Sequence, residues 1–249
     1  FAKTDEVWTP SNYSRNSIVN SGIDFDKVQT IPNGIDPKIF KPFGKKYELK
    51  TKKKFKFLYV GGTIYRKGID ILLNSYKNVI KAEDEVCLVI KDLGGDSFYK
   101  GINAKEDILK IQNEPNMPDI EYIEEKLTEE EMAELYRACD VFVCSYRGEG
   151  FSLPTLEAMA CGLPVIVTEG GATEDFVTDD VSWKIKSNEI ELGDEIDEQE
   201  LVEGATILEP DINALTEIIR IVYDNPSEIF AKGMLASLKA RKEWTWEKA

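Results

Sequence analysis

The chain has 249 residues, of which 42% are hydrophobic and 31% are charged, a composition typical of a soluble globular protein with one large or two modest domains. Its formal charge of −15 at pH 7 argues against nucleic acid as the main partner, because phosphate backbones are bound by clustered Lys and Arg. Histidine is absent, which excludes a Ser-His-Asp hydrolase within this chain and disfavours a zinc site.

The first 34 residues form a small strand-helix-strand pattern of their own. The stretch "EVWTP" predicts a strand, a helix is expected from Ser11 to Gly22, and "KVQTI" predicts a second strand before the turn "PNG". The sequence begins with Phe1 inside this pattern. We therefore expect the chain to be a fragment of a longer protein.

The following residues alternate between apolar strands and amphipathic helices. A helix is predicted over 68–81, a second begins with the capping box Thr128–Glu131, and a third has Asp211 as its N-cap. Near-continuous apolar strands between helices predict a doubly wound α/β domain with a parallel sheet. The acidic segment 189–203 is expected to be a solvated surface excursion. The sheet strands are predicted at 55–60, 86–90, 120–123, 141–145 and 165–168.

The loop after the first sheet strand has the features of an anion site. Gly61 and Gly62 let the backbone approach a ligand just before a helix N-terminus, and Arg66 and Lys67 lie in the same loop. Free N–H groups, the helix dipole and two cations favour a phosphate. The alternative is an ordinary strand-to-helix turn with two solvated basic residues.

The loop 146–152 is a second candidate for ligand binding. A helix is predicted to begin near Leu153, which leaves N–H groups around Ser152 to Thr155 available for an anion. Glu157 is not explained as a capping-box partner and is placed to accept hydrogen bonds from a diol. Glu149 would face the other end of the same ligand. The alternative for each glutamate is a solvated surface residue.

The chain shows no sign of export or of a membrane span. No apolar run approaches the ~20 residues needed to cross a bilayer. The four cysteines lie in or beside apolar runs without CxxC spacing, and we expect them to be small buried hydrophobes in a reducing compartment. These features favour a cytoplasmic location.

The run "EGFSLPTLEAMACGLPVI" closely resembles the Glu, seven residues, Glu signature of the retaining glycosyltransferases of family 4, which have the GT-B fold. The stretches "TIPNGID", "YVGGTIYRKGIDILL", "ELYRACDVFV", "GGATEDFV" and the terminal "WTWEKA" extend the resemblance over nearly the whole chain. It implies two Rossmann-like domains that face each other across a cleft. Residues 1–36 would then be the tail of the acceptor domain and its hinge, 37–240 the nucleotide-sugar-binding domain, and 241–249 the start of a segment that returns toward the missing acceptor domain.

The resemblance also implies a role for each candidate residue. Glu157 would hold the ribose hydroxyls, and Glu149 the hydroxyls of the donor sugar. Lys67, with Arg66 second, would neutralise the diphosphate as the sugar leaves with retention at its anomeric carbon. No metal or cofactor is implied, because GT-B enzymes generally work without a metal. The further donor-binding residues would be Gly61, Gly62, Gly150, Phe151, Ser152, Leu153 and Thr155.

The sequence departs from the family pattern at one phosphate contact. Many relatives have an arginine where this chain has Gly62, and Arg66 is a candidate replacement.

The loops at 91–96 and 121–131 do not identify the base, uracil or guanine, and Lys126 is either a base or phosphate contact or a solvated lysine. The resemblance implies an acceptor whose identity stays open, a glycan, a lipid or a small molecule. The missing domain would bind this acceptor and could also contact a membrane. The alternative function is a non-catalytic nucleotide-sugar-binding or regulatory module; a nicotinamide dehydrogenase would need a GxGxxG motif that "VGGTIYRKG" lacks.

Overall fold

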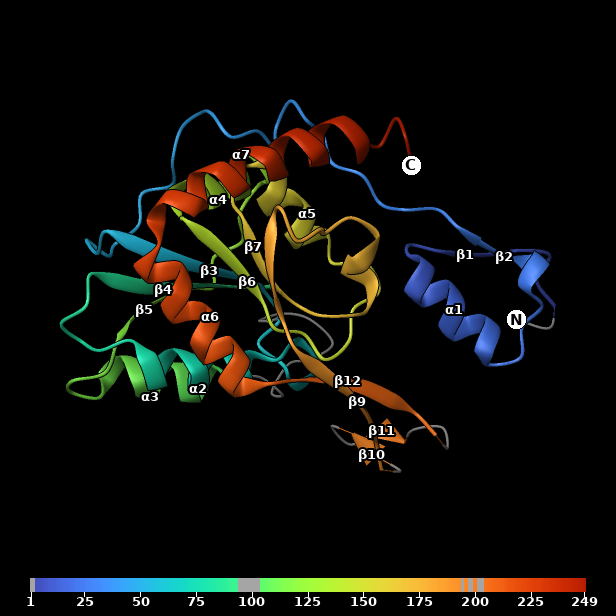
Figure 1. The fold of residues 1–249 in the computed structure, drawn as a ribbon, viewed down its shortest axis with the longest axis horizontal. Coiled ribbons are helices and arrows are strands. Elements are labelled where there is room, and N and C mark those ends of the chain that lie inside the picture. Colours follow the sequence, from blue (N-terminus) through green and yellow to red (C-terminus); the bar gives the residue numbers. More distant parts are fainter. Residues whose placement is uncertain (1–2, 94–103, 194, 197–198, 201–203) are drawn as a thin grey trace.

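A six-stranded parallel sheet forms the centre of the protein (Figure 1). The computed structural model describes residues 3–93, 104–193, 195–196, 199–200 and 204–249. The strand order is β5-β4-β3-β6-β7-β8, and every neighbouring pair is parallel. The predicted parallel sheet is therefore confirmed, with one further strand, β8, at its edge. The strands are β3 (Phe55–Gly61), β4 (Val86–Asp92), β5 (Asp119–Ile123), β6 (Val141–Cys144), β7 (Val165–Thr168) and β8 (Ser182–Ile185).

Helices cover both faces of this sheet, as the near-continuous apolar strands predict. All seven residues of β4 are buried. One hydrophobic cluster joins the sheet to α2, α3 and α6, and a second joins its other face to α4, α5 and α7. The doubly wound α/β architecture is confirmed. The helices are α2 (Ile69–Val79), α3 (Lys105–Asn113), α4 (Glu129–Ala138), α5 (Leu153–Ala160), α6 (Ile212–Asp224) and α7 (Pro226–Glu243).

The predicted helix starts agree with the structure. Thr128 accepts a hydrogen bond from the Glu131 backbone, while the Glu131 carboxylate accepts one from the Thr128 N–H, so the capping box is complete. Asp211 caps α6 through the N–H groups of Asn213 and Ala214. All four cysteines are buried and unpaired, as expected. No helix among the described residues is long and apolar enough to span a membrane.

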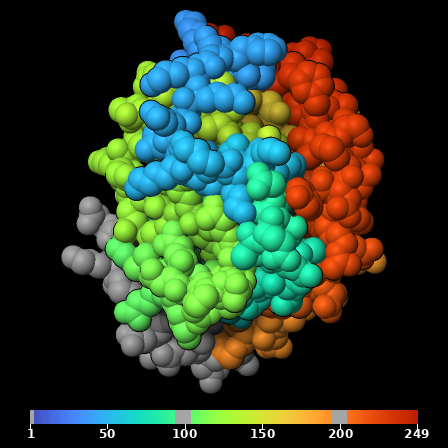
Figure 2. Space-filling view, turned by 90° about the vertical axis from the view of Figure 1, so that its left-hand side faces the viewer, coloured from blue at the N-terminus to red at the C-terminus, as the bar shows by residue number. Residues whose placement is uncertain are grey.

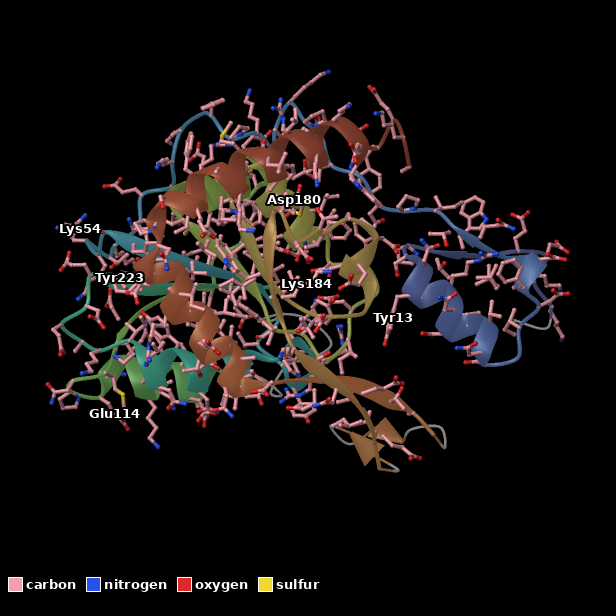
Figure 3. The ribbon with its side chains drawn as sticks, in the orientation of Figure 1. Tyr13, Lys54, Glu114, Asp180, Lys184 and Tyr223 are labelled. Atoms are coloured by element: carbon pink, nitrogen blue, oxygen red, sulfur yellow. The ribbon has the colours of Figure 1, made fainter. Side chains whose placement is uncertain are left out.

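The N-terminal residues form a separate unit beside the large sheet (Figure 1). It consists of β1 (Val7–Thr9), α1 (Asn12–Asn20), the 3-10 turn η1 (Phe25–Lys27) and β2 (Val28–Thr30), and its two strands pair in parallel. Ser11 caps α1, as the predicted start requires, and its hydroxyl donates to the Gly150 carbonyl over 2.7 Å. Tyr13 lies on the side of α1 that faces the large domain (Figure 3). This unit thus contacts the loop that follows β6.

The segment that leaves this unit crosses the C-terminal end of the chain. Ile35 forms a parallel bridge with Thr245, and a Cβ at Gly34 would lie 2.2 Å from the Trp246 nitrogen, so the two backbones are in close contact. Residues 37–54 then lie across the surface (light blue in Figure 2), where the Tyr47 N–H donates to the Glu134 carbonyl of α4 over 3.0 Å. The C-terminal residues and the segment after residue 30 therefore pass side by side.

The acidic segment contains paired strands. Strand β9 (Ser187–Glu191) pairs with β12 (Thr206–Pro210) in an antiparallel hairpin that projects from the domain (Figure 1). The short strands β10 (Glu195–Ile196) and β11 (Gln199–Glu200) pair farther out. Most of β9 is exposed, as expected. The segment is therefore a surface excursion, as expected, in which cross-strand pairing satisfies the backbone groups of β9 and β12.

Candidate functional site

The strand order reverses between β3 and β6, and this point is where open α/β sheets bind their ligands. The chain proceeds from β3 outward to β5, and then returns to the other side of β3 as β6. The loop after β3 contains the 3-10 turn η2 (Tyr65–Lys67), and the loop after β6 leads into α5. The two candidate loops of the sequence therefore lie side by side at this switch point, where the Arg147 and Gly148 N–H groups donate to the Arg66 carbonyl. We call the place where these two loops meet the crevice.

The structure brings the three predicted charged residues together in this crevice. Lys67 forms an ion pair with the Glu149 carboxylate, whose side chain is only 8% exposed. The Arg66 guanidinium lies 3.8 Å from the same carboxylate and donates to the Gly148 carbonyl over 2.6 Å. The turn is thus more than a pair of solvated cations. Two positive charges and one negative charge leave a net positive site.

Backbone donors complete the anion site. Within the described part of the chain, the N–H groups of residues 150–153 donate to no backbone carbonyl or side chain. Ser152 has a left-handed conformation, with φ at 72°, and directly precedes α5. These donors lie at a helix N-terminus, where the dipole favours negative charge.

Three residues of this stretch face the protein interior with their side chains. The Thr155 N–H donates to the Ser152 carbonyl over 3.0 Å, so the expectation that this N–H is free for an anion is wrong. The hydroxyls of Ser152 and Thr155 lie 2.8 Å apart in a buried pair. The Phe151 ring packs against Phe176 and Trp244. Leu153, in contrast, lines a cavity.

That cavity, of about 930 Å³, opens at the carboxyl edge of the sheet beside the start of α5. Glu157 lines it, and so does Lys126, which the sequence left open as a solvated residue. Lys91 at the end of β4 also lines it, and burial lowers the pKa of its ammonium. Residues 94–96 of the loop predicted near the base lie outside the described residues. The full lining is Val60, Lys91, Asp92, Leu93, Lys105, Glu124, Lys126, Leu127, Met132, Leu153, Pro154 and Glu157.

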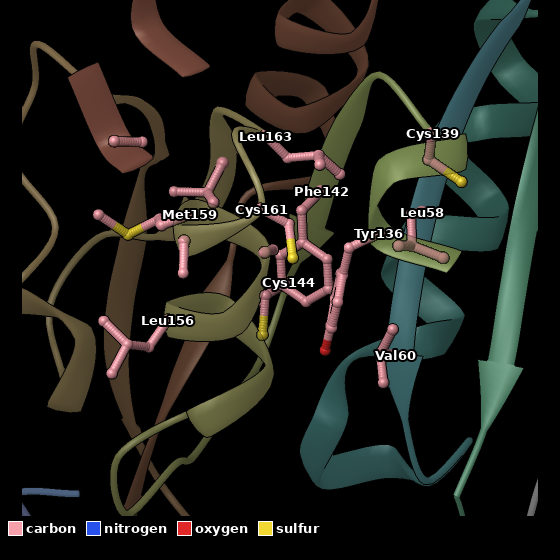
Figure 4. Packing of buried hydrophobic residues seen from close by; sticks show 14 of the residues in the cluster. Leu58, Val60, Tyr136, Cys139, Phe142, Cys144, Leu156, Met159, Cys161 and Leu163 are labelled. Carbon is pink, nitrogen blue, oxygen red and sulfur yellow. The ribbon is translucent and has the colours of Figure 1, made fainter. Parts of the chain in front are cut away.

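The carboxylate of Glu157 is held by a buried phenol. Tyr136 of α4 is fully buried, and its hydroxyl donates to Glu157 Oε2 over 2.8 Å. Figure 4 shows the Tyr136 ring beside Phe142, with its hydroxyl at the end nearer Val60. Burial raises the pKa of Glu157 to about 7, and the Tyr136 hydrogen bond only partly opposes this shift. Glu157 thus changes charge near neutral pH.

The two glycines after β3 leave the backbone open. Gly61 ends β3, and the Gly62 carbonyl accepts a hydrogen bond from the Tyr59 hydroxyl over 2.8 Å. Among the residues that the structure describes, a Cβ at Gly62 would meet only Ile64 side-chain atoms, at 4.0 Å. The described residues therefore do not crowd the position where many relatives have an arginine.

Sequence reasoning missed two residues that organise the site. Tyr136 lies on the apolar face of α4, where its spacing indicates an ordinary core residue. Arg147 lies two positions before Glu149, is 3% exposed, and makes bidentate contacts with Asp70 and Glu209. Its only signal in the sequence is an arginine three residues after the end of the buried strand β6.

The chain is similar to known proteins in sequence and in fold. The sequence profile of the family described as glycosyl transferases group 1 matches residues 41–227. A putative glycosyltransferase 45 of Sulfolobus islandicus filamentous virus is 27% identical over 188 residues, which cover 74% of this chain and 47% of the viral protein.

Two solved structures are similar over nearly the whole chain. Sucrose-phosphate synthase from Thermosynechococcus elongatus has a TM-score of 0.72 at 20% identity, covering 98% of this chain and 55% of that protein. HepE of Anabaena, in complex with UDP-glucose, has a TM-score of 0.69 at 16% identity, covering 97% and 60%. These likenesses confirm the expected GT-B-type fold.

The chain spans about half the length of the curated relatives it matches, from 39% to 52% of the first five. The family match nevertheless covers most of the sequence and includes both loops of the crevice. It also includes the helix that carries Glu157. The chain therefore belongs to the glycosyl transferases group 1 family.

Proposed function

We propose that this chain is the donor-binding part of a retaining glycosyltransferase of family 4. It would transfer a sugar from a nucleotide-diphosphate sugar to an acceptor hydroxyl with retention of anomeric configuration. The observation that carries this proposal is the convergence of Lys67, Arg66 and Glu149 at the switch point of the sheet, next to the cavity lined by Glu157. A complex with UDP-glucose is described for the similar HepE structure, which supports this ligand class.

The diphosphate would lie over the N–H groups of residues 150–153, which have no partner among the described residues, with the cations of the η2 turn beside it. Negative charge grows on the diphosphate as the bond to the sugar breaks. Donors fixed in advance stabilise that charge without reorganisation. Lys67 is already held by Glu149, so its ammonium needs no large rearrangement to contribute. Arg66 supplies the second cation in place of the arginine missing at Gly62.

The two glutamates would hold the two ends of the donor. Glu157 lines the large cavity and accepts the ribose hydroxyls through its carboxylate. Glu149 lies in the crevice beside the cations and accepts hydroxyls of the sugar. An ion pair with Lys67 suits Glu149 to orienting the donor, and we assign it no covalent role. The proposal includes no metal or cofactor.

Transfer would need a second domain to bind the acceptor. Residues 1–36 would be the tail of that domain and its hinge, and residues 241–249 a segment returning toward it, since the two cross at Ile35 and Thr245. Closure of two domains excludes water and orients the reactants, and this orientation can lower the activation free energy by ~7–11 kcal/mol. The 249-residue chain alone would bind donors but catalyse at most slow hydrolysis.

Calorimetric titration of the 249-residue chain with UDP, UDP-glucose, GDP and GDP-mannose tests this proposal. Binding of one nucleoside diphosphate together with its nucleotide-sugar supports the proposal and identifies the base. Absence of binding for all four contradicts it. A full-length protein that binds a nucleotide-sugar but transfers no sugar to any hydroxyl acceptor would favour the non-catalytic binding module instead.

A further inference from the structure

The guanidinium of Arg147 uses every one of its five N–H donors. Its Nε donates to Glu209 Oε2 over 2.6 Å, and one terminal nitrogen donates to Asp70 Oδ1 over 2.7 Å and to the Tyr65 carbonyl over 2.8 Å. The other terminal nitrogen donates to Asp70 Oδ2 and Glu209 Oε1 over 2.8 and 3.0 Å. The guanidinium carbon also lies 3.8 Å from the Tyr65 ring centroid. Such a saturated group has no donor left for a ligand.

The partners of Arg147 come from three separate elements. Tyr65 belongs to η2, which carries Arg66 and Lys67, while Asp70 lies in the first turn of α2. Glu209 belongs to β12 of the projecting hairpin. Arg147 itself lies in the loop that carries Glu149. One buried guanidinium therefore connects the loop after β6, in which Arg147 lies, to the loop after β3, to α2 and to the hairpin.

Backbone hydrogen bonds connect the same three parts of the chain, the loop after β3, the loop after β6 and the hairpin. The Arg147 N–H donates to the Arg66 carbonyl over 2.8 Å, and the Leu208 N–H of β12 donates to the Arg147 carbonyl over 3.0 Å. The Leu208 side chain would approach within 3.3 Å of a Cβ at Gly171. The base of the hairpin is thus packed onto the crevice loops, although the hairpin is outside the six-stranded sheet.

We propose that Arg147 is a positioning residue that holds Lys67 and Glu149 in register across the crevice and connects both to the β9–β12 hairpin. The inference rests on the proposed function, since it gives these loops their role with a diphosphate. Arg147 would act only through the loops, because its donors are all occupied. The hairpin would accordingly influence donor affinity through Glu209 without touching the donor.

The geometry requires arginine in particular. A planar fork can serve two carboxylates and a carbonyl at once, whereas a lysine ammonium has three donors on one atom. Removing the guanidinium would also leave the Asp70 and Glu209 carboxylates close together without their shared cation. We therefore expect Arg147→Lys to rescue little of what Arg147→Met loses.

Hydrogen exchange of the whole chain without ligand tests the positioning role directly. The amides of Lys67, Gly68 and Arg147 donate to backbone carbonyls in the wild type. We expect their exchange to accelerate in Arg147→Met and Arg147→Lys, and less in Glu209→Gln, while β3 and β6 keep their protection. Glu191→Gln, on the exposed part of β9, is the matched control and should change nothing there. Wild-type exchange at the three amides in Glu209→Gln and both Arg147 variants would overturn the inference.

Affinity for UDP and for uridine separates positioning from general loss of structure. We expect Arg147→Met to weaken UDP binding about tenfold or more, since a displacement near 1 Å of a binding group can have effects of this size. The affinity for uridine, measured by ligand-observed NMR, should be unchanged, because Glu157 makes no contact with Arg147 or its partners. Equal loss for both ligands would overturn the inference. If Arg147→Met does not fold, the affinities of Glu209→Gln for UDP and uridine test the inference instead. If the wild type binds no nucleotide, the proposed function fails, and the hydrogen-exchange measurement alone tests the inference.

Discussion

The Tyr136 hydroxyl lies 2.8 Å from Glu157 Oε2 and donates to it, so that one oxygen of this carboxylate is occupied by a buried phenol. The phenol reaches Glu157 from α4, while Glu157 itself lies on α5. Burial is the dominant influence on Glu157 and raises its pKa to about 7. The candidate ribose contact is therefore sensitive to pH in the neutral range.

Nucleotide affinity should increase as the pH rises through about 7. The ionised Glu157 carboxylate accepts hydrogen bonds from hydroxyls, whereas the protonated form loses acceptor capacity. With a pKa of about 7, the ionised fraction rises about tenfold between pH 6 and pH 8, and UDP affinity should follow it. Calorimetry over this range measures the effect. Glu157→Gln is the control, and the same pH dependence in that variant would assign the titration to the phosphate.

Glu157→Gln should stabilise the fold at pH 8. The folded pKa of Glu157 is raised from 4.5 to about 7, so its contribution to stability is largest below pH 4.5 and is lost as the pH rises to 7. Above pH 7 the partly buried carboxylate is charged, and glutamine removes the cost of that charge, up to about 3 kcal/mol, while still accepting a hydrogen bond from Tyr136. Urea unfolding at pH 5 and pH 8 measures it. If Glu157→Gln gains no more free energy of unfolding at pH 8 than the exposed control Glu191→Gln, the raised pKa is not that of Glu157.

Lys67→Ala should weaken nucleotide-diphosphate binding by roughly 1.5–3 kcal/mol, the scale of a charged hydrogen bond. Alanine also leaves Glu149, which is 8% exposed, without its close cation and so adds repulsion toward the diphosphate. Lys67→Arg should keep part of the affinity, because it keeps the charge but changes the geometry. Calorimetry with UDP and GDP decides this. Unchanged affinity in Lys67→Ala would show that the η2 turn binds no anion.

Glu157→Ala and Glu149→Ala should have different effects on two ligands. Glu157→Ala should reduce binding of the nucleotide and the nucleotide-sugar alike, since ribose is common to both. Glu149→Ala should mainly reduce the preference for the nucleotide-sugar, since its proposed contacts are to the sugar. Four titrations make the comparison. Equal losses for both ligands in both variants would disprove this division of roles.

Gly68→Ala should destabilise the protein by about 3 kcal/mol or more. Gly68 has φ at +66°, and a Cβ there would lie 1.8 Å from the Ser145 carbonyl oxygen, so the loops after β3 and β6 would have to separate. Gly22→Ala is the matched control, because Gly22 also has a positive φ, at +93°, but no atom of the described residues lies within 4 Å of a Cβ there. Urea unfolding compares the two. Similar losses in both variants would show that backbone strain alone, and not the close approach, decides the cost.

Most of the fold could be predicted from local patterns. The apolar strands, the capping box at Thr128 and the Asp211 N-cap each depend on neighbouring residues, and each agrees with the structure. The hairpin of the acidic segment could not be predicted in this way, because the exposed strands of an antiparallel hairpin show no apolar alternation. Thr155 was wrongly expected to offer a free N–H, since the left-handed Ser152 lets the first turn of α5 close on itself.

The sequence by itself determined which residue types meet at the carboxyl edge: two cations on one loop, and two glutamates flanking a helix start on the other. Their spacing along the chain follows from the alternation of strand, loop and helix. Only the tertiary structure decided how they are used. Lys67 pairs with Glu149 across 82 residues of chain, and Arg147 with Asp70 across 77. Such contacts depend on which strands become neighbours, and no local propensity or periodicity carries that information.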